Sequence, residues 1–179
     1  DIDPFTDADA YGLIDSAVRA IGVPTLVGLV VATEDGTQLE NTGVVWDPVS
    51  GPGARYVKRH PVPFGEYVPF RGALGWISAT DQVAVDRTPG EEVTLISLPG
   101  LPKIGTPICY ENSFPSIDRE MTRLGAGILV VVINNASYER TAASEQHLLM
   151  SRLRAAENGR WVVHAAVSGI SAFIDEHGR

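Results

Sequence analysis

Runs of apolar residues, separated by turn residues, divide the chain into alternating strands and helices. Residues 25–33 and 128–133 are almost continuously apolar, which is typical of strands buried on both faces of a sheet, and we expect 25–33 to be a central strand. Shorter runs predict further strands at 42–46, 54–60, 93–98, 161–168 and 170–174, and one that ends at Cys109. Helical periodicity predicts helices at 7–20, 115–124 and 145–158. This order predicts an α/β fold of mixed sheets with helices outside.

Two polar or proline-rich segments interrupt this alternation where a functional site is expected. Segment 61–76 holds too many prolines for a helix or a central strand, so we expect a shaped loop, which usually lies over a site. Residues 134–137 end strand 128–133 with polar groups, at the sheet edge where open α/β folds place their ligands.

Composition narrows the class of protein. A length of 179 residues, 44% hydrophobic and 20% charged, indicates one globular domain. The net charge of −8 argues against a nucleic-acid partner. The longest apolar run is far short of the roughly 20 residues that span a bilayer. A single cysteine excludes an internal disulfide, and no spacing of ligand residues predicts a metal or another cofactor.

That cysteine, Cys109, stands where a predicted strand gives way to a predicted helix. Backbone N–H groups and the helix dipole at such a position favour an anion and lower the pKa of a thiol. The same layout forms the nucleophile elbow of unrelated hydrolases. The alternative is a cysteine that packs in the core, although the neighbouring Glu111 is a poor choice for a core position.

Cysteine acyl-transfer chemistry needs a thiolate, a proton acceptor, and a positive group where the oxyanion develops. Lys58, at the end of a predicted strand, is a candidate for the positive group. Two carboxylates are close to these residues in sequence: Glu66 follows Lys58 in the proline-rich loop, and Glu111 follows Cys109. The four histidines stand in no obvious Cys–His arrangement. Without further information Lys58 could equally be an exposed strand lysine.

Three segments of the chain together resemble the apolipoprotein N-acyltransferases, the membrane-bound branch of the nitrilase (carbon–nitrogen hydrolase) superfamily. Segment 56–69, YVKRHPVPFGEYVP, is similar to their lysine motif Y-x-K-x-H-x-V-P-F-G-E-x-V-P, and segment 108–111, ICYE, to their nucleophile motif. Gln146-His147 and the helix after it, with Arg152, Arg154 and Glu157, resemble the segment Q-H-x-x-x-A-R-x-R-A-x-E.

The resemblance implies a nitrilase-like αββα sandwich and a Glu–Lys–Cys catalytic set. Cys109 would be the nucleophile, Lys58 would stabilise the oxyanion, and Glu66 and Glu111 would hold Lys58 and the loop. Tyr110 would give its backbone N–H to the oxyanion hole and shape the pocket. The acyl donor would be a phospholipid and the acceptor the N-terminal amine of a diacylglyceryl-cysteine lipoprotein. The implied location is the extracytoplasmic face of the cell membrane.

The chain departs from the family pattern in several places. The general-base Glu of the family lies in a W-P-E motif that falls upstream of Asp1. Asp1, Asp3 and Asp7 could replace it, but acidic residues at a helix start more often complement the dipole. Residues 134–137 read N-N-A-S where the family commonly has N-D-A-W. The flanking membrane helices and the last strands of the fold are also missing. We therefore expect an excised catalytic domain, inactive or nearly so by itself.

Two other functions remain open from the sequence. One is a soluble nitrilase-type amidase that hydrolyses a small C–N bond, and the other is a degenerate domain that only binds partners. His60 and His147 are expected to pack or cap their segments, and His164 to be a satisfied core residue. Trp76 would either pack or touch lipid.

Overall fold

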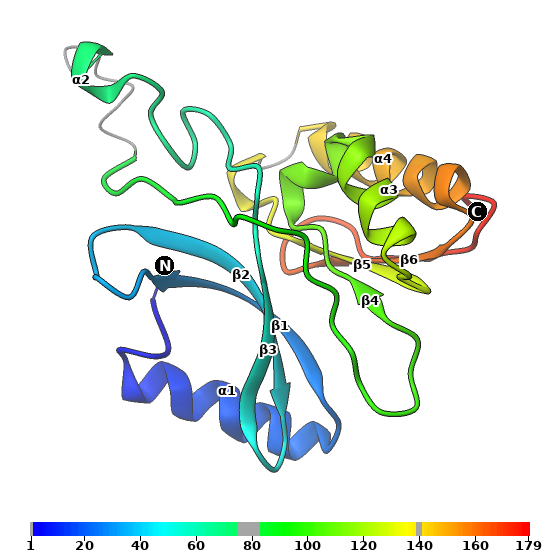
Figure 1. Ribbon diagram of the computed structural model, residues 1–179, viewed down its shortest axis with the longest axis horizontal. Helices are drawn as coiled ribbons and strands as arrows, with labels where there is room; N and C mark the ends of the chain where they lie inside the picture. The colour runs from blue at the N-terminus through cyan, green and yellow to red at the C-terminus, as the bar shows by residue number, and fades with distance from the viewer. Residues whose placement is uncertain (1, 75–82, 139–140) are drawn as a thin grey trace. The chain divides into compact units, whose positions relative to one another are not determined.

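The computed structural model describes residues 2–74, 83–138 and 141–179, and the chain forms two compact units (Figure 1). Unit 1 comprises Asp1–Gly53 and Val57–Glu91, and unit 2 comprises Ala54–Tyr56 and Glu92–Arg179. The chain first passes from one unit to the other within strand β3 (Gly51–Val57).

Unit 1 opens with helix α1 (Ala8–Ile21), whose two ends match the expectation for 7–20. The Asp7 side chain accepts a hydrogen bond from the Ala10 N–H, so this acidic residue is the N-cap. Gly22 ends the helix in the left-handed conformation at φ 78° and bonds back to the Val18 carbonyl. Asp7 thus serves its own helix, as acidic residues at a helix start usually do.

Strands β1 (Thr25–Ala32), β2 (Leu39–Asp47) and β3 form one sheet in the order β1-β2-β3. β1 and β2 pair antiparallel, from Thr25 opposite Trp46 to Ala32 opposite Leu39. The expectation of a central strand at 25–33 is wrong for the part of the chain that the structure describes, because β1 lies at the sheet edge. The expected burial of both faces is also wrong, since only Val31 of β1 is buried. An apolar run carries no information about neighbours in the hydrogen-bonding direction.

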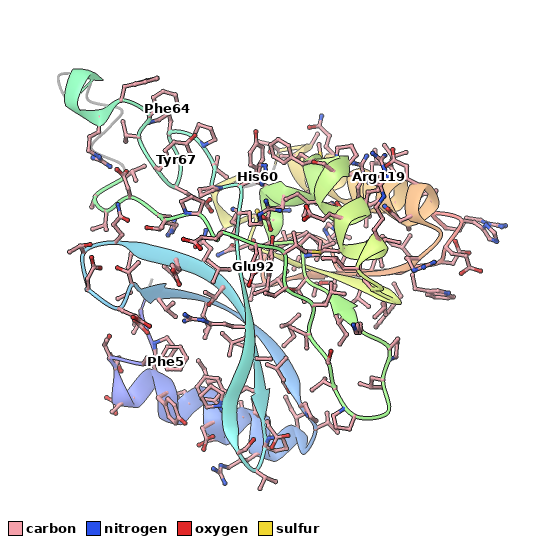
Figure 2. All side chains as sticks on the ribbon, in the orientation of Figure 1. Phe5, His60, Phe64, Tyr67, Glu92 and Arg119 are labelled. Atoms are coloured by element: carbon pink, nitrogen blue, oxygen red, sulfur yellow. The ribbon has the colours of Figure 1, made fainter. Side chains whose placement is uncertain are left out.

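Trp46, which has no exposed surface, anchors α1 to this sheet. Phe5, labelled in Figure 2, stacks on Trp46 with ring centroids 6.2 Å apart, and Tyr11 lies 4.8 Å away. The indole N–H donates to Asp15 at 3.2 Å, so the one polar atom of the ring is satisfied.

Unit 2 is built on a mixed sheet in the order β4-β5-β6-β7. Its first three strands are parallel and the last is antiparallel, which confirms the predicted mixed sheet. The bounds are β4 (Ile104–Gly105), β5 (Ile128–Ile133), β6 (Trp161–Ala166) and β7 (Ala172–Ile174). The strand expected at 93–98 is only an isolated bridge between Ile96 and Ile104.

Helices α3 (Pro115–Arg123) and α4 (Ala143–Asn158) lie side by side over this sheet, where 115–124 and 145–158 were expected (Figure 1). The core between them is fully buried and includes Ile117, Met121, Leu129, Val131, Ala155 and Val162. The described residues also form short helices: α2 (Arg71–Leu74) inside the proline-rich loop, and the 3-10 turns η2 (Cys109–Ser113) and η3 (Ala136–Tyr138).

Asp118 of α3 is a buried carboxyl whose two oxygens have no hydrogen-bond partner among the described residues. Burial raises its pKa to about 7, and Arg154 of α4 offsets this only in part. A carboxyl whose pKa is higher in the folded state than the unfolded value of 3.8 favours folding while it is protonated. Its contribution to stability is therefore lost as the pH rises from about 4 to 7.

We predict that Asp118→Asn removes this component of the pH dependence of folding. An amide does not titrate, so the fall in unfolding free energy between pH 4 and 7 should be smaller in the variant by up to about 4 kcal/mol. Urea unfolding at several pH values measures it. An identical slope in the two proteins would show that Asp118 is already ionised at pH 4.

Gly105 of β4 leaves no room for a side chain. A Cβ at this position would lie 2.7 Å from the Leu129 side chain and 3.0 Å from that of Met121. Gly105→Ala should therefore lower the unfolding free energy by about 1–3 kcal/mol through overpacking. Gly12→Ala is the matched control, because its Cβ meets nothing within 4 Å and the helix interior favours alanine by up to about 1 kcal/mol. Thermal unfolding should shift in opposite directions for the two variants.

Candidate active site

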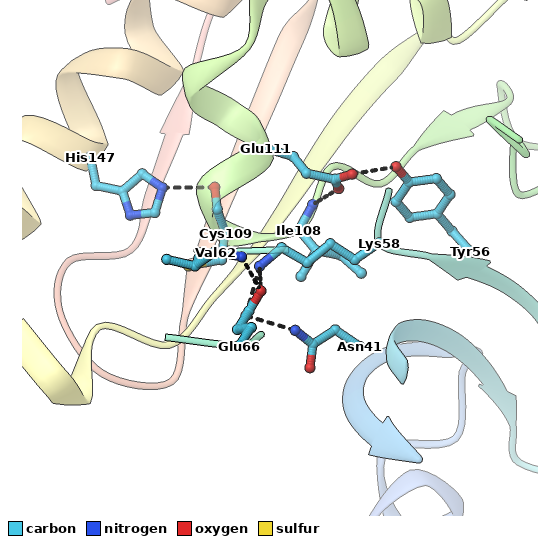
Figure 3. A network of polar contacts seen from close by, with 9 residues as sticks. All are labelled: Asn41, Tyr56, Lys58, Val62, Glu66, Ile108, Cys109, Glu111 and His147. Atoms are coloured by element: carbon cyan, nitrogen blue, oxygen red, sulfur yellow. Dashed lines mark hydrogen bonds and ion pairs between the residues drawn. The ribbon is translucent and has the colours of Figure 1, made fainter. Parts of the chain in front are cut away.

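The polar residues expected to carry chemistry form two clusters, one in each unit, and Figure 3 draws the residues of both. The first cluster centres on Lys58, the residue that follows β3. Its backbone is fixed on both sides, since its N–H donates to the Asn41 carbonyl and its carbonyl accepts from the Gly90 N–H, each at 2.8 Å. Its side chain is only 1% exposed, so the alternative of a surface lysine is wrong.

Glu66 is the counter-ion of Lys58. Both carboxylate oxygens accept from the Lys58 ammonium at 2.8 Å. One oxygen also accepts from the Asn41 side chain and the other from the Val62 N–H, each at 2.7 Å (Figure 3). Four hydrogen bonds on one carboxylate hold the ammonium in a single place.

The proline-rich loop brings Glu66 back to Lys58 through a tight turn. The N–H groups of Gly65 and Glu66 both donate to the Val62 carbonyl, and Phe64 adopts a left-handed φ of 60°. The Val62 N–H donates to the Glu66 carboxylate, which closes the turn on itself. The segment is thus a built loop, as its prolines indicate.

The second cluster, in unit 2, surrounds Cys109. Ile108 is extended and bridges Val132 of β5, and Cys109 then turns sharply with a φ of 50°. A left-handed conformation at a residue other than glycine costs of order 1–3 kcal/mol, and such positions concentrate at functional sites. The thiol-bearing residue is half-buried.

The segment after Cys109 differs from the expected strand-to-helix junction. Cys109 begins the 3-10 turn η2, and α3 starts only at Pro115. The reason is Glu111, which is fully buried and whose carboxylate accepts from the Ile108 N–H at 2.8 Å. That bond closes a short turn before the longer helix can begin. The dipole of α3 therefore does not start at the thiol.

Glu111 also reaches the strand that leads toward Lys58. Its other carboxylate oxygen accepts from the Tyr56 hydroxyl at 2.8 Å, and Tyr56 is itself fully buried in unit 2 (Figure 3). Tyr110, next to the thiol, packs its ring edge-on against Phe114 at 5.1 Å. Glu111 is thus a brace of the turn that carries Cys109.

Sequence reasoning missed the role of His147, which was expected only to pack or cap its helix. His147 lies in α4, is 6% exposed, and places its Nε2 atom 2.9 Å from the Cys109 carbonyl oxygen (Figure 3). Its Nδ1 atom lies 3.1 Å from the Asn135 side chain, at the end of β5. The sequence carried one signal for this role, which is that His147 lies close in the chain to residues 134–137, the polar end of a predicted strand.

A further buried chain of polar groups lies behind His147. The Asn112 amide donates to Ser151 at 2.8 Å, and the Ser151 hydroxyl lies 2.6 Å from Nδ1 of His164. His164 is fully buried, and burial lowers its pKa to about 4, so the ring is neutral. His164 is a core residue, as expected, and Ser151 joins it to α4. The expectation of a fully satisfied ring is wrong, because Nε2 is buried with no hydrogen-bond partner among the described residues.

Two properties of the described residues bear on the site. Within 2–74, 83–138 and 141–179, no group of three potential ligand side chains could hold a metal ion. Over the same ranges, no helix is long and apolar enough to cross a bilayer. Trp76, which was considered for lipid contact, lies outside the described residues.

Comparison with known proteins places the chain in a family. The model of the carbon-nitrogen hydrolase family matches residues 6–179. The chain belongs to the carbon-nitrogen hydrolase family. The expectation drawn from the lysine and nucleophile motifs is thereby confirmed at the level of the family.

Relatives by sequence bear one name. The chain is 41% identical over 99% of its length to the apolipoprotein N-acyltransferase of Mycolicibacterium smegmatis, and 33% identical over 97% to that of Geobacter metallireducens. It spans 30% and 34% of those proteins, about a third of their length.

Solved structures support the fold. An amidase from Nesterenkonia sp. matches 99% of this chain and 63% of its own, with a TM-score of 0.69 at 19% identity. Saccharomyces cerevisiae Nit3, a member of the nitrilase superfamily, matches 94% of this chain and 58% of its own, with a TM-score of 0.64 at 16% identity. The carbon-nitrogen hydrolase chain thus has the nitrilase-like α/β fold that was expected.

We predict that Glu66→Gln destabilises unit 1. The substitution leaves the buried Lys58 ammonium without its counter-charge, and breaking a buried ion pair from one side costs about 3–5 kcal/mol. Thermal unfolding measures the loss. Glu91→Gln, at an exposed position, is the matched control and should change stability by no more than about 0.5 kcal/mol. Equal stability of the two variants would contradict a structural ion pair.

Proposed function

We propose that this chain is the catalytic part of an enzyme that moves an acyl chain from a phospholipid to the N-terminal amine of a lipoprotein. The observation that carries the proposal is the strained, braced turn at Cys109, in a chain that is 41% identical to an apolipoprotein N-acyltransferase. The lysine motif adds a second support, because Lys58 is a buried lysine whose charge is fixed by Glu66.

In the first step, the Cys109 thiolate attacks the carbonyl carbon of a phospholipid ester. The C–S bond forms, the ester C–O bond breaks, and the lysophospholipid leaves with a proton from the carboxyl group that the family pattern places upstream of Asp1, which becomes the carboxylate of the second step. The Lys58 ammonium and the Tyr110 N–H stabilise the negative oxygen of the tetrahedral intermediate. Glu66 holds Lys58 in place for this role, and Glu111 holds the turn that carries the thiol.

In the second step, the amine of the lipoprotein attacks the Cys109 thioester. The C–N bond forms, the C–S bond breaks, and the amine proton passes to the carboxylate that the family pattern places upstream of Asp1. The thiolate is regenerated and the product is an amide. Such a two-step reaction uses one oxyanion site twice. We place the reaction at the extracytoplasmic face of the membrane, where both substrates would meet it.

A second candidate is an amidase that uses the same residues on a small C–N bond. The observation in its favour is the fold it shares with the Nesterenkonia sp. amidase, of which a mutant structure carries the acetamide moiety of fluoroacetamide on its active-site cysteine. In both candidates Cys109 forms an acyl-enzyme, so the acyl donor decides between them.

The complete protein in phospholipid micelles should show an acyl-sized mass increase on the Cys109 peptide. A thioester predicts that hydroxylamine removes the adduct, that Cys109→Ser lacks it, and that Lys58→Ala forms it at least about 100-fold more slowly. Peptide mass spectrometry measures all three. Hydrolysis of small amides without a lipid adduct would assign the amidase, and neither activity would assign a non-catalytic binding domain.

A further inference from the structure

A histidine contacts the carbonyl oxygen of the peptide bond between Cys109 and Tyr110. His147 Nε2 lies 2.9 Å from the Cys109 carbonyl oxygen. A carbonyl oxygen can only accept a hydrogen bond, so His147 must carry a proton on Nε2. Because His147 is 6% exposed, this bond is made away from bulk water.

The other ring nitrogen shows how that tautomer is held. Nδ1 lies 3.1 Å from the atom assigned as the Asn135 side-chain oxygen, while the Asn135 amide nitrogen is buried with no partner in the described part of the chain. Exchanging the oxygen and nitrogen of the Asn135 amide places an N–H donor at Nδ1 and leaves a carbonyl oxygen, instead of a donor, in the unpartnered buried position. Nδ1 then accepts, and the single ring proton is on Nε2. We assign the amide this way.

The geometry of a peptide bond extends this grip to the next residue. The Cys109 carbonyl and the Tyr110 N–H belong to one planar trans peptide, in which they point in opposite directions. A donor that fixes the carbonyl on one side therefore fixes the direction of the N–H on the other. Since Cys109 is held at a left-handed φ of 50°, this peptide would otherwise relax toward the common conformations.

We propose that His147, as the neutral Nε2–H tautomer held by Asn135, is a positioning residue that aims the Tyr110 N–H at the oxyanion formed on Cys109. The proposal rests on the proposed function in one respect, which is that Cys109 forms an acyl-enzyme. It adds a residue to the machinery that supports the known motifs, and this residue acts only through the Cys109–Tyr110 peptide.

The surroundings of His147 suit a fixed, neutral ring. The His164 ring meets it at 5.6 Å in an edge-to-face arrangement, and His164 is itself tied through Ser151 to Asn112 of η2. Asn112 also lies within 3.4 Å of the His147 carbonyl. The hydrogen bonds of Asn112 therefore connect α4 to η2 independently of the His147 ring.

The test compares two replacements of His147 in the complete protein in phospholipid micelles. The amide nitrogen of His147→Gln can donate in place of Nε2, whereas His147→Leu fills a similar volume without a donor. We expect His147→Leu to slow acylation of Cys109 by about 100-fold with little change in KM for the phospholipid, as for the loss of one oxyanion donor. His147→Gln should recover most of that rate.

Alkylation of Cys109 by iodoacetamide separates this role from a general disturbance. Alkylation uses the thiol but forms no oxyanion, so it should change far less than acylation in His147→Leu. Asn158→Ala, which removes a side-chain hydrogen bond at the far end of the same helix, is the matched control and should leave both rates unchanged. If His147→Leu does not fold, Asn135→Ala gives the same comparison with His147 in place.

Three results would overturn the proposal. They are acylation in His147→Leu at the wild-type rate, equal losses in His147→Gln and His147→Leu, and an equal loss of acylation and alkylation. Failure of the proposed function has a different signature, because Cys109→Ser would then keep full activity or no acyl adduct would form in the wild-type protein.

Discussion

A left-handed turn at Cys109 is the constraint that its neighbours in unit 2 are arranged to hold. A side chain at φ 50° is strained, and the turn persists only where its surroundings hold it. Glu111 holds the residue before it through the Ile108 N–H, and His147 holds its carbonyl. Because these partners come from the turn itself and from α4, the fold of unit 2 is needed before the thiol can be presented.

In unit 1, an ion pair holds the buried Lys58 side chain in place. Lys58 is almost fully buried, and an unpaired ammonium in that position would be strongly destabilising. Glu66 supplies the counter-charge, and Asn41 and the Val62 N–H satisfy the remaining capacity of its carboxylate. The tight turn of the proline-rich loop completes this arrangement, because it brings Glu66 back to the end of β3.

The contacts that hold Cys109 and Lys58 do not distinguish lipid acyl transfer from amide hydrolysis. The fold is shared with an amidase at 19% identity, and a fold alone does not specify the reaction. What differs is the acyl donor and the nucleophile that resolves the acyl-enzyme. Those are properties of the pocket and of the whole protein, of which this chain covers about a third in its named relatives.

The sequence by itself determined the secondary structure of the strongly periodic segments and the identity of the family. The helices at α1, α3 and α4 and the strand β5 follow from local pattern and from caps such as Asp7, Gly22 and Gly159, which act within a few residues. The motifs around Lys58, Glu66 and Cys109 could be read because their residues lie close together in the chain.

Only the tertiary structure decided the partners of those residues. The edge position of β1 depends on which strands pair with one another. Ile96 forms only an isolated bridge because its pairing with Ile104 does not extend into a longer ladder. The contact of His147 with the Cys109 carbonyl joins residues 38 positions apart, and that of Tyr56 with Glu111 joins residues 55 apart. Periodicity and spacing report a residue's own neighbourhood, whereas hydrogen bonds between distant segments exist only once the chain has folded.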